Sequence, residues 1–183
     1  MDLKKMEQGV RLILQGMGVD LTESNFEGTP TRVAKLYHEM LTPQTNNWRT
    51  FPSPTKGMIV LRNHAVHALC PHHLMPVTLK AFVAYIPRDS KDSKVLGLSK
   101  LARVIESCLT RPIMQEELGE EAVTALYEQT NALGAAVVLE GEHGCMKYRG
   151  IETTGDVATS HLRGIFQHSE QTRNEFLSLI GRR

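Results

Sequence analysis

Two short segments of the chain gather the side chains that bind transition metals. The segment Cys70–His73 holds one thiol and two imidazoles, and the segment His143–Cys145 adds another of each far downstream. Cysteine and histidine are the usual ligands of zinc, and a catalytic zinc keeps three protein ligands and leaves its fourth position open. Cys70, His73 and Cys145 would make such a set, because the Cys-x-x-His spacing lets two side chains reach one ion while the fold brings in the third.

Two imidazoles remain once these ligands are assigned. His72 and His143 would then be available for proton transfer near neutral pH. A lone cysteine is often only a small buried hydrophobe, but a cluster of this size favours metal binding, although its spacing also permits a structural zinc. A structural site usually closes with a fourth ligand, and the remaining thiol, Cys108, falls on the apolar face of a predicted helix, where core packing is its simplest role.

The composition is that of an ordinary globular protein. The chain has 183 residues, 41% hydrophobic and 22% charged, which suits one domain with a substantial core. With 21 basic against 20 acidic residues, no charge imbalance points to nucleic acid or to an anionic membrane as a partner. Three cysteines cannot all pair, and neither a signal peptide nor a long apolar span is evident, so we expect a cytoplasmic protein.

The N-terminal part reads as a helical region, residues 1–56, ahead of a single structural unit, residues 57–183. Apolar residues at helical spacing predict helices at 6–17 and 29–41, the second with Thr29 as N-cap and Pro30 in its first turn. Arg32 and Lys35 lie on the polar face of that second helix. Residues 42–57, rich in Pro, Asn, Thr and Ser, predict a long connection.

The remaining pattern predicts an antiparallel sheet with helices. Alternating apolar residues predict strands on both sides of the Cys-Pro-His-His turn, so the metal cluster would lie where two strands meet. A short strand leads into the second half of the cluster, and the segment after it would return as a hairpin. We expect strands at 58–69, 74–86, 135–140 and 146–151, helices at 98–109, 115–132 and 171–180, and polar loops at 87–94 and 153–164.

Two helix starts carry charged residues that could bind a ligand. Ser99, Lys100 and Arg103 lie in or beside the first turn of the helix at 98–109, with Ser99 as a plausible N-cap. Free N–H groups already favour anions there, and two added cations favour a phosphate over a merely solvated face. Gln115 and Glu116 begin the next helix, where an acidic residue is also ordinary capping chemistry.

These motifs, in this order, resemble GTP cyclohydrolase I. Any one of them alone would be weak evidence, but their order and spacing make chance similarity improbable. The resemblance runs from about Glu27 to the C-terminus through the segments 27–35 (EGTPTRVAK), 70–73 (CPHH), 83–87 (VAYIP), 97–103 (GLSKLAR), 111–112 (RP), 115–116 (QE), 143–145 (HGC) and 149–150 (RG).

The resemblance implies an α+β tunnelling fold (T-fold), in which an antiparallel β-sheet carries helices on one face and follows N-terminal helices. It implies a toroidal homodecamer of two pentamers, with active sites between subunits. The implied reaction is hydrolytic opening of the GTP imidazole ring at C8, release of formate and closure to 7,8-dihydroneopterin triphosphate. That product can enter folate, tetrahydropterin or 7-deazaguanine synthesis.

The resemblance also assigns roles within the site. Zn²⁺ would be held by Cys70, His73 and Cys145 and would activate water for attack on C8, and His143 and His72 would move protons. A carboxylate can accept from the N1–H and the exocyclic amine of guanine together, which is the role of Glu116, assisted by Gln115. The triphosphate would contact Ser99, Lys100, Arg103 and Arg149, with Arg32 and Lys35 supplied by a neighbouring subunit.

Two departures from the family pattern bear on substrate affinity. The family usually has Glu at the position of Pro71. Proline at this position removes a carboxylate and stiffens the turn that carries the metal ligands. The Ser and Thr alternation that usually follows the Arg-Gly pair is altered, with Gly155-Asp156-Val157 in its place, although Thr159, Ser160 and Gly164 remain. Asp156 would oppose a triphosphate if its carboxylate pointed into the site.

Other classes fit the residues less well. A nitrile reductase of the same fold would use a cysteine nucleophile without zinc, and a pyruvoyl-pterin synthase would hold zinc with three histidines. Neither pattern matches Cys70, His73 and Cys145. A non-catalytic zinc-stabilised binding protein would need neither the spare histidines nor Glu116, so we favour the enzyme.

Overall fold

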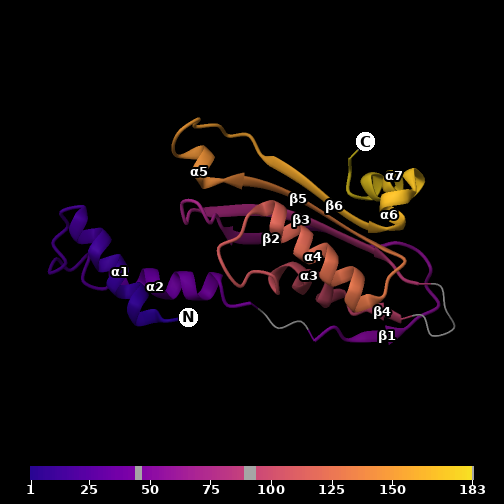
Figure 1. The fold of residues 1–183 in the computed structure, drawn as a ribbon, viewed down its shortest axis with the longest axis horizontal. Helices are drawn as coiled ribbons and strands as arrows, with labels where there is room; N and C mark the ends of the chain where they lie inside the picture. The colour runs from indigo at the N-terminus through magenta and orange to yellow at the C-terminus, as the bar shows by residue number, and fades with distance from the viewer. Residues whose placement is uncertain (44–46, 89–93, 183) are drawn as a thin grey trace. The chain divides into compact units, whose positions relative to one another are not determined.

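The computed structural model describes residues 1–43, 47–88 and 94–182, which form two compact units, Met1–Thr42 and Pro43–Arg183 (Figure 1). The predicted division at residues 56 and 57 stays a prediction. Parts of two predicted segments, the connection at 42–57 and the loop at 87–94, lie outside the described residues. Among the residues described, no helix has both the length and the apolar character needed to cross a membrane.

The N-terminal unit is a pair of helices, α1 (Leu3–Gly16) and α2 (Thr29–Met40), as predicted. Asp2 caps α1 by accepting from the backbone N–H of Lys5 at 3.1 Å. The predicted N-cap of α2 was wrong: Gly28 holds that position, and Pro30 follows in the first turn. The Thr29 hydroxyl is instead engaged with the carbonyl of Asn25 and accepts from Arg32 at 2.8 Å.

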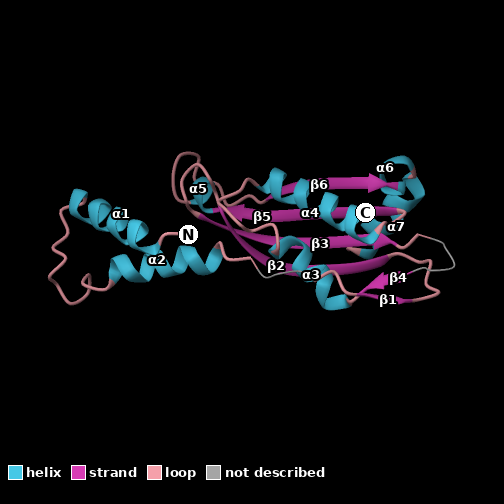
Figure 2. Cartoon of the chain, turned by 60° about the horizontal axis from the view of Figure 1, so that its bottom comes forward, coloured by secondary structure: helices cyan, strands magenta, loops and turns pink. Residues whose placement is uncertain are grey.

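The second unit is built on a four-stranded antiparallel sheet in the order β2-β3-β5-β6 (Figure 2). A small second sheet pairs β1 with β4, antiparallel, so that strands occur in segments predicted as a connection and as a loop. The strands are β1 (Thr50–Pro52), β2 (Ile59–Leu69), β3 (Pro76–Ile86), β4 (Lys94–Leu96), β5 (Gly134–His143) and β6 (Val157–Gly164).

One face of the sheet is covered by two helices, α3 (Leu98–Glu106) and α4 (Gln115–Thr130) (Figure 1). Alternation along β3 sends Leu79, Val83 and Tyr85 into the main core, where they pack with apolar residues of both helices. Tyr85 is fully buried, and its hydroxyl accepts from the backbone N–H of Leu96 at 2.7 Å, which attaches β4 to this core. The predicted sheet with helices on one face is confirmed in this layer.

The opposite face has its own small cluster. The helices α6 (Ile165–His168) and α7 (Glu170–Leu179) bring Phe166 and Phe176 together edge to face, with ring centroids 5.8 Å apart. They pack against Phe82 and Ala84, the β3 residues that point away from α4. A C-terminal helix was predicted at 171–180, and the structure confirms it.

Two predictions between residues 144 and 164 were wrong. Residues 146–151 were expected to pair with the preceding strand, but the chain instead makes one short helix, α5 (Gly144–Lys147). On the side away from β3, β5 pairs with β6, which was expected to be a polar loop. As the outermost strand, β6 has a burial pattern of intermediate and exposed positions, so Thr, Ser, His and Arg occupy it and the usual apolar alternation is missing.

Candidate active site

The turn between β2 and β3 carries the first two metal-binding candidates. The backbone N–H of Cys70 donates to the carbonyl of Met75 at 2.9 Å, and that of Leu74 donates to the carbonyl of Cys70 at 2.9 Å. Leu74 adopts a left-handed conformation with φ of 52°, which turns the chain back into β3. The closed turn buries Cys70 and leaves His73 exposed.

The third candidate comes from the end of β5. His143 is the last residue of that strand and pairs with Val77 of β3, just beyond the turn. The chain then enters α5, whose second residue is Cys145. Because β5 lies beside β3, the register of the sheet carries Cys145 to the Cys70 turn.

The three predicted ligand residues converge. One ligand atom from each of Cys70, His73 and Cys145 lies within 4.8 Å of the other two. Zinc bonds of about 2.3 Å to sulfur and 2.0 Å to nitrogen separate tetrahedral ligand atoms by roughly 3 to 4 Å, so a small adjustment would seat the ion. All three cysteines are free thiols, and burial is the largest of the effects that raise the pKa of Cys145, with Cys70 beside it. Two soft thiols and one imidazole suit zinc.

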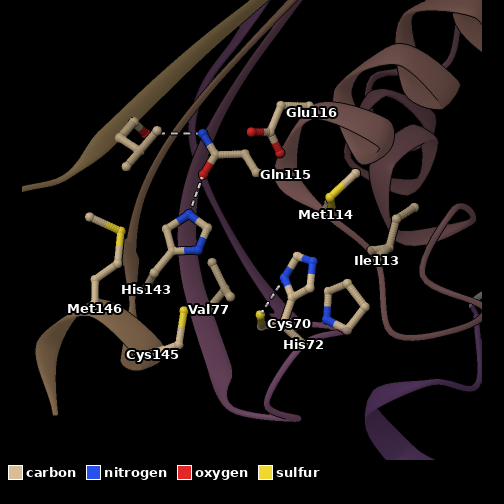
Figure 3. A pocket seen from close by; sticks show the side chains of 12 residues that line it. Cys70, His72, Val77, Ile113, Met114, Gln115, Glu116, His143, Cys145 and Met146 are labelled. Atoms are coloured by element: carbon tan, nitrogen blue, oxygen red, sulfur yellow. Dashed lines mark hydrogen bonds between the residues drawn. The ribbon is translucent and has the colours of Figure 1, made fainter. Parts of the chain in front are cut away.

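A pocket of about 220 Å³ opens beside these ligands (Figure 3). Its lining joins the ends of β3 and β5 to the start of α4, so catalytic and binding candidates from distant segments face one space. The lining residues are Cys70, Pro71, His72, Val77, Ile113, Met114, Gln115, Glu116, His143, Cys145, Met146 and Val157.

Both spare imidazoles lie in this pocket. The Nε2 atom of His143 is 2.8 Å from Oε1 of Gln115. Burial lowers the pKa of His143, and the nearby carboxylate of Glu116 opposes that shift only in part. His72 lies next to a candidate ligand, with Nδ1 3.7 Å from the sulfur of Cys70. The site therefore holds one imidazole fixed by a hydrogen bond and one beside the thiolate candidate.

Glu116 and Gln115 differ in how they meet the pocket. Glu116 is exposed in the first turn of α4, and its carboxylate lies at the pocket. Gln115 is only 3% exposed, and its amide nitrogen donates to the carbonyls of Leu139 and Val157, each at 3.0 Å. Glu116 is thus open to a ligand, whereas the amide of Gln115 is bonded within the protein.

Of the residues of the second unit predicted to bind phosphate, only Arg149 lies beside the metal cluster. Arg149 lies at the metal cluster, where its guanidinium is 2.7 Å from Nε2 of His73. Ser99, Lys100 and Arg103 lie on α3 and do not line the pocket. Arg32 and Lys35 belong to α2 in the N-terminal unit. One chain therefore presents the metal, acid–base and guanine candidates together, with Arg149 beside them.

The structure brings two residues to the site that the sequence did not place there. Val157 lines the pocket and Thr159 contacts the amide of Gln115 at 3.3 Å, but both lie on β6, which gave no strand signal. Asp156, which could have opposed a triphosphate, instead lines a separate hollow with Thr78, Lys80, Glu140, Gly141 and Glu142.

Comparison with known proteins identifies close relatives over nearly the whole chain. The sequence profile of a family described as GTP cyclohydrolase I matches residues 6–181. A "GTP cyclohydrolase 1" from Carboxydothermus hydrogenoformans is 41% identical over 98% of this chain and 95% of its own length. One from Pelotomaculum thermopropionicum is 39% identical over 98% and 97%. One from Streptococcus pneumoniae is 36% identical over 99% and 100%.

Proposed function

Because the chain belongs to the GTP cyclohydrolase I family, we propose how the residues of its pocket divide the work of that reaction. The protein has the α+β tunnelling fold and is a GTP cyclohydrolase I. It opens the imidazole ring of GTP by hydrolysis at C8, releases formate and yields 7,8-dihydroneopterin triphosphate. One observation carries the assignment of roles: three metal ligands converge beside a pocket that also holds two imidazoles and a carboxylate.

We assign Zn²⁺ to Cys70, His73 and Cys145. The donor set of two thiols and one imidazole supports zinc, and three protein ligands leave one position for water or substrate. When bound, zinc would supply Lewis-acid activation of water at neutral pH.

Proton transfer falls to the two spare imidazoles. His143 is held by Gln115 and partly buried in the pocket, so we assign it the protonation of the purine N7 as the ring opens. His72, on the ligand turn, would move protons in the later steps of sugar rearrangement and ring closure. Both assignments are supported by position, since one ring reaches the pocket from the end of β5 and the other from the turn between β2 and β3.

Guanine recognition falls to Glu116. Its carboxylate can accept from the N1–H and the exocyclic amine of guanine at once, and its exposure at the start of α4 leaves it free to do so. Gln115 was expected to assist at the base, and that contact stays a prediction. Arg149 would bind the triphosphate near the metal cluster.

The other phosphate residues support an oligomeric site. We propose that Ser99, Lys100 and Arg103, together with Arg32 and Lys35, complete pockets between subunits of a homodecamer. Two features favour assembly: Leu12 and Ile13 of α1 and its C-cap residue Met17 are exposed, and the outer strands β2 and β6 each have a single neighbour within the described sheet. We also place the enzyme in the cytoplasm, where reducing conditions keep ligand thiols free.

The test is incubation of zinc-loaded protein with GTP, with formate and dihydropterin absorbance followed together and a chelated sample as control. Formate and pterin, both abolished by chelation, would support the zinc assignment. Formate that persists after complete metal removal would refute it.

The intersubunit proposal has its own test. Co-expression of Cys145→Ala with Arg103→Ala should restore part of the activity that each variant lacks alone, because some pockets would then combine an intact metal site with an intact Arg103. No recovery in a verified mixed oligomer would mean that both residues serve the same pocket from one chain.

A further inference from the structure

The amide of Gln115 can be oriented in only one way. Its Nε2 contacts two backbone carbonyls, those of Leu139 in β5 and Val157 in β6, at 3.0 Å each. Carbonyl oxygens only accept, so the NH₂ end must face them. The hydroxyl of Thr159, at 3.3 Å, can accept there as well. The oxygen end is therefore forced toward His143.

This orientation fixes the hydrogen on the histidine ring. Oε1 of Gln115 lies 2.8 Å from Nε2 of His143 and can only accept a hydrogen bond. Nε2 must then carry the hydrogen, which leaves Nδ1 as the nitrogen with a free lone pair in the neutral ring. Figure 3 shows that second ring nitrogen on the pocket side, toward Cys145 and His72.

The surroundings favour this arrangement over a rotated amide. Gln115 is almost completely buried, so the reversed amide would set an oxygen against two carbonyls without water to compensate. Gly141 leaves room for the Gln115 amide oxygen and for the side chain of Leu79. A Cβ at this position would lie 2.1 Å from Cδ2 of Leu79 and 3.3 Å from Oε1 of Gln115.

We propose that Gln115 is a positioning residue that holds His143 in its Nε2–H tautomer and so selects Nδ1 as the atom that exchanges the proton with the purine. The inference rests on the proposed role of His143. Neutral His143 takes a proton at Nδ1 from the water that attacks C8, and the cationic ring then carries hydrogen on both nitrogens. Nδ1–H gives that proton to N7 as the N7–H bond forms and the purine ring opens, which returns His143 to the neutral form with its Nε2–H still donated to Gln115.

The tautomer can be measured without reference to turnover. Solid-state ¹⁵N NMR of histidine-labelled, zinc-loaded protein, with His143→Ala used to identify the signal, should show a neutral His143 protonated at Nε2 and bare at Nδ1. A neutral wild-type His143 with its hydrogen on Nδ1 and a bare Nε2 would overturn the proposal, and this outcome would leave the cyclohydrolase assignment untouched.

Two substitutions test the consequence for catalysis. Gln115→Met fills the space without an acceptor, so kcat for formate release should fall by about 10- to 100-fold while zinc content and the KM for GTP change less than about threefold. Gln115→Glu sets a carboxyl oxygen against the carbonyls of Leu139 and Val157, so its carboxyl must be protonated to fit the site. In that form the O–H donates to a carbonyl and the other oxygen still accepts from Nε2, so the variant should retain the tautomer and exceed Gln115→Met in kcat. A raised KM with unchanged kcat in Gln115→Met would instead give Gln115 a guanine-binding role.

Thr159→Val is the matched control. It removes the longest of the three contacts to the amide nitrogen of Gln115 and keeps both carbonyls, so the Nε2–H tautomer of His143 should persist. A loss of the tautomer in Thr159→Val would show that the carbonyls do not fix the amide, which contradicts the argument.

Discussion

The guanidinium of Arg149 lies 2.7 Å from Nε2 of His73, so a proposed phosphate ligand and a proposed metal ligand are bonded to each other. Arginine only donates, and so Nε2 accepts in this contact. A neutral imidazole that binds a metal through Nε2 has lost that acceptor, and one that binds through Nδ1 carries its hydrogen on Nε2. Metal binding by a neutral His73 and this hydrogen bond therefore exclude each other.

Substitution of Arg149 should strengthen metal binding for this reason. In Arg149→Met, zinc no longer competes with the guanidinium, and its affinity should rise about two- to fivefold, a modest gain because both side chains are exposed. Competition with a chromogenic chelator measures it. The same variant should show a higher KM for GTP, since a cation is lost from the phosphate site.

Lys147→Met is the control for charge alone. It removes a neighbouring cation that pairs with Glu142 at 2.9 Å and has no described contact with His73. An equal gain in zinc affinity in both variants would attribute the effect to general charge and contradict the exclusion.

Substitutions of the proposed metal ligands and of the proposed acid should have different effects when zinc content and turnover are measured on the same samples. Cys70→Ala and Cys145→Ala each remove one of three ligands, so zinc content and formate release should both be lost. His143→Ala should keep its zinc and lose turnover by about 100-fold or more. A zinc-bound His143→Ala enzyme with undiminished turnover would refute its role as the acid.

Tyr85→Phe tests the attachment of β4 to the core. The substitution leaves the buried N–H of Leu96 without the hydroxyl that accepts from it, which should lower the free energy of unfolding by about 1 to 3 kcal/mol. Urea titrations at one protein concentration measure the change. Tyr148→Phe, at an exposed position, should stay within about 0.5 kcal/mol. Equal stability for both variants would argue against the anchor.

Cys108 should make the free energy of unfolding decrease as the pH rises above 9. Burial raises the pKa of its thiol to about 11 from the ordinary 9, so between these values the folded chain keeps a proton that the unfolded chain has lost. The stabilising effect is present below pH 9 and is lost as pH rises toward 11. Between pH 8 and pH 10 wild type should lose on the order of 1 kcal/mol more than Cys108→Ala. Parallel losses in both proteins would remove Cys108 as the cause.

Much of the fold was predictable because local signals agreed with burial. The helix around Leu101 buries one apolar face, and β3 alternates between two packed faces, so periodicity revealed both. The edge strand β6 has partly exposed residues such as Thr159 and His161, so its pairing with β5 is visible only in three dimensions. The predicted N-caps of α2 and α3 were wrong for a similar reason. Side-chain preference favoured Thr29 and Ser99, but the backbone geometry gives these positions to Gly28 and Gly97.

The candidate site also contains residues that could be predicted from the sequence and residues that could not. Candidate metal ligands could be chosen from residue type, and the sheet register brings Cys145 to Cys70. The role of Gln115 could not be read from the sequence, because it depends on two carbonyls from strands far along the chain. The predicted phosphate residues of α3 and α2 do not line the pocket, so their proposed role requires a neighbouring subunit.

The three proposed metal ligands are unequally covered: Cys70 is buried, Cys145 is half-buried and His73 is exposed. An incoming chelator can therefore reach the ion first on the side of His73, while the thiols remain held by the strand ends. We expect exchange of the metal to start with release of the imidazole, so that the rate of zinc loss, as distinct from its equilibrium affinity, is governed by how long His73 stays bound.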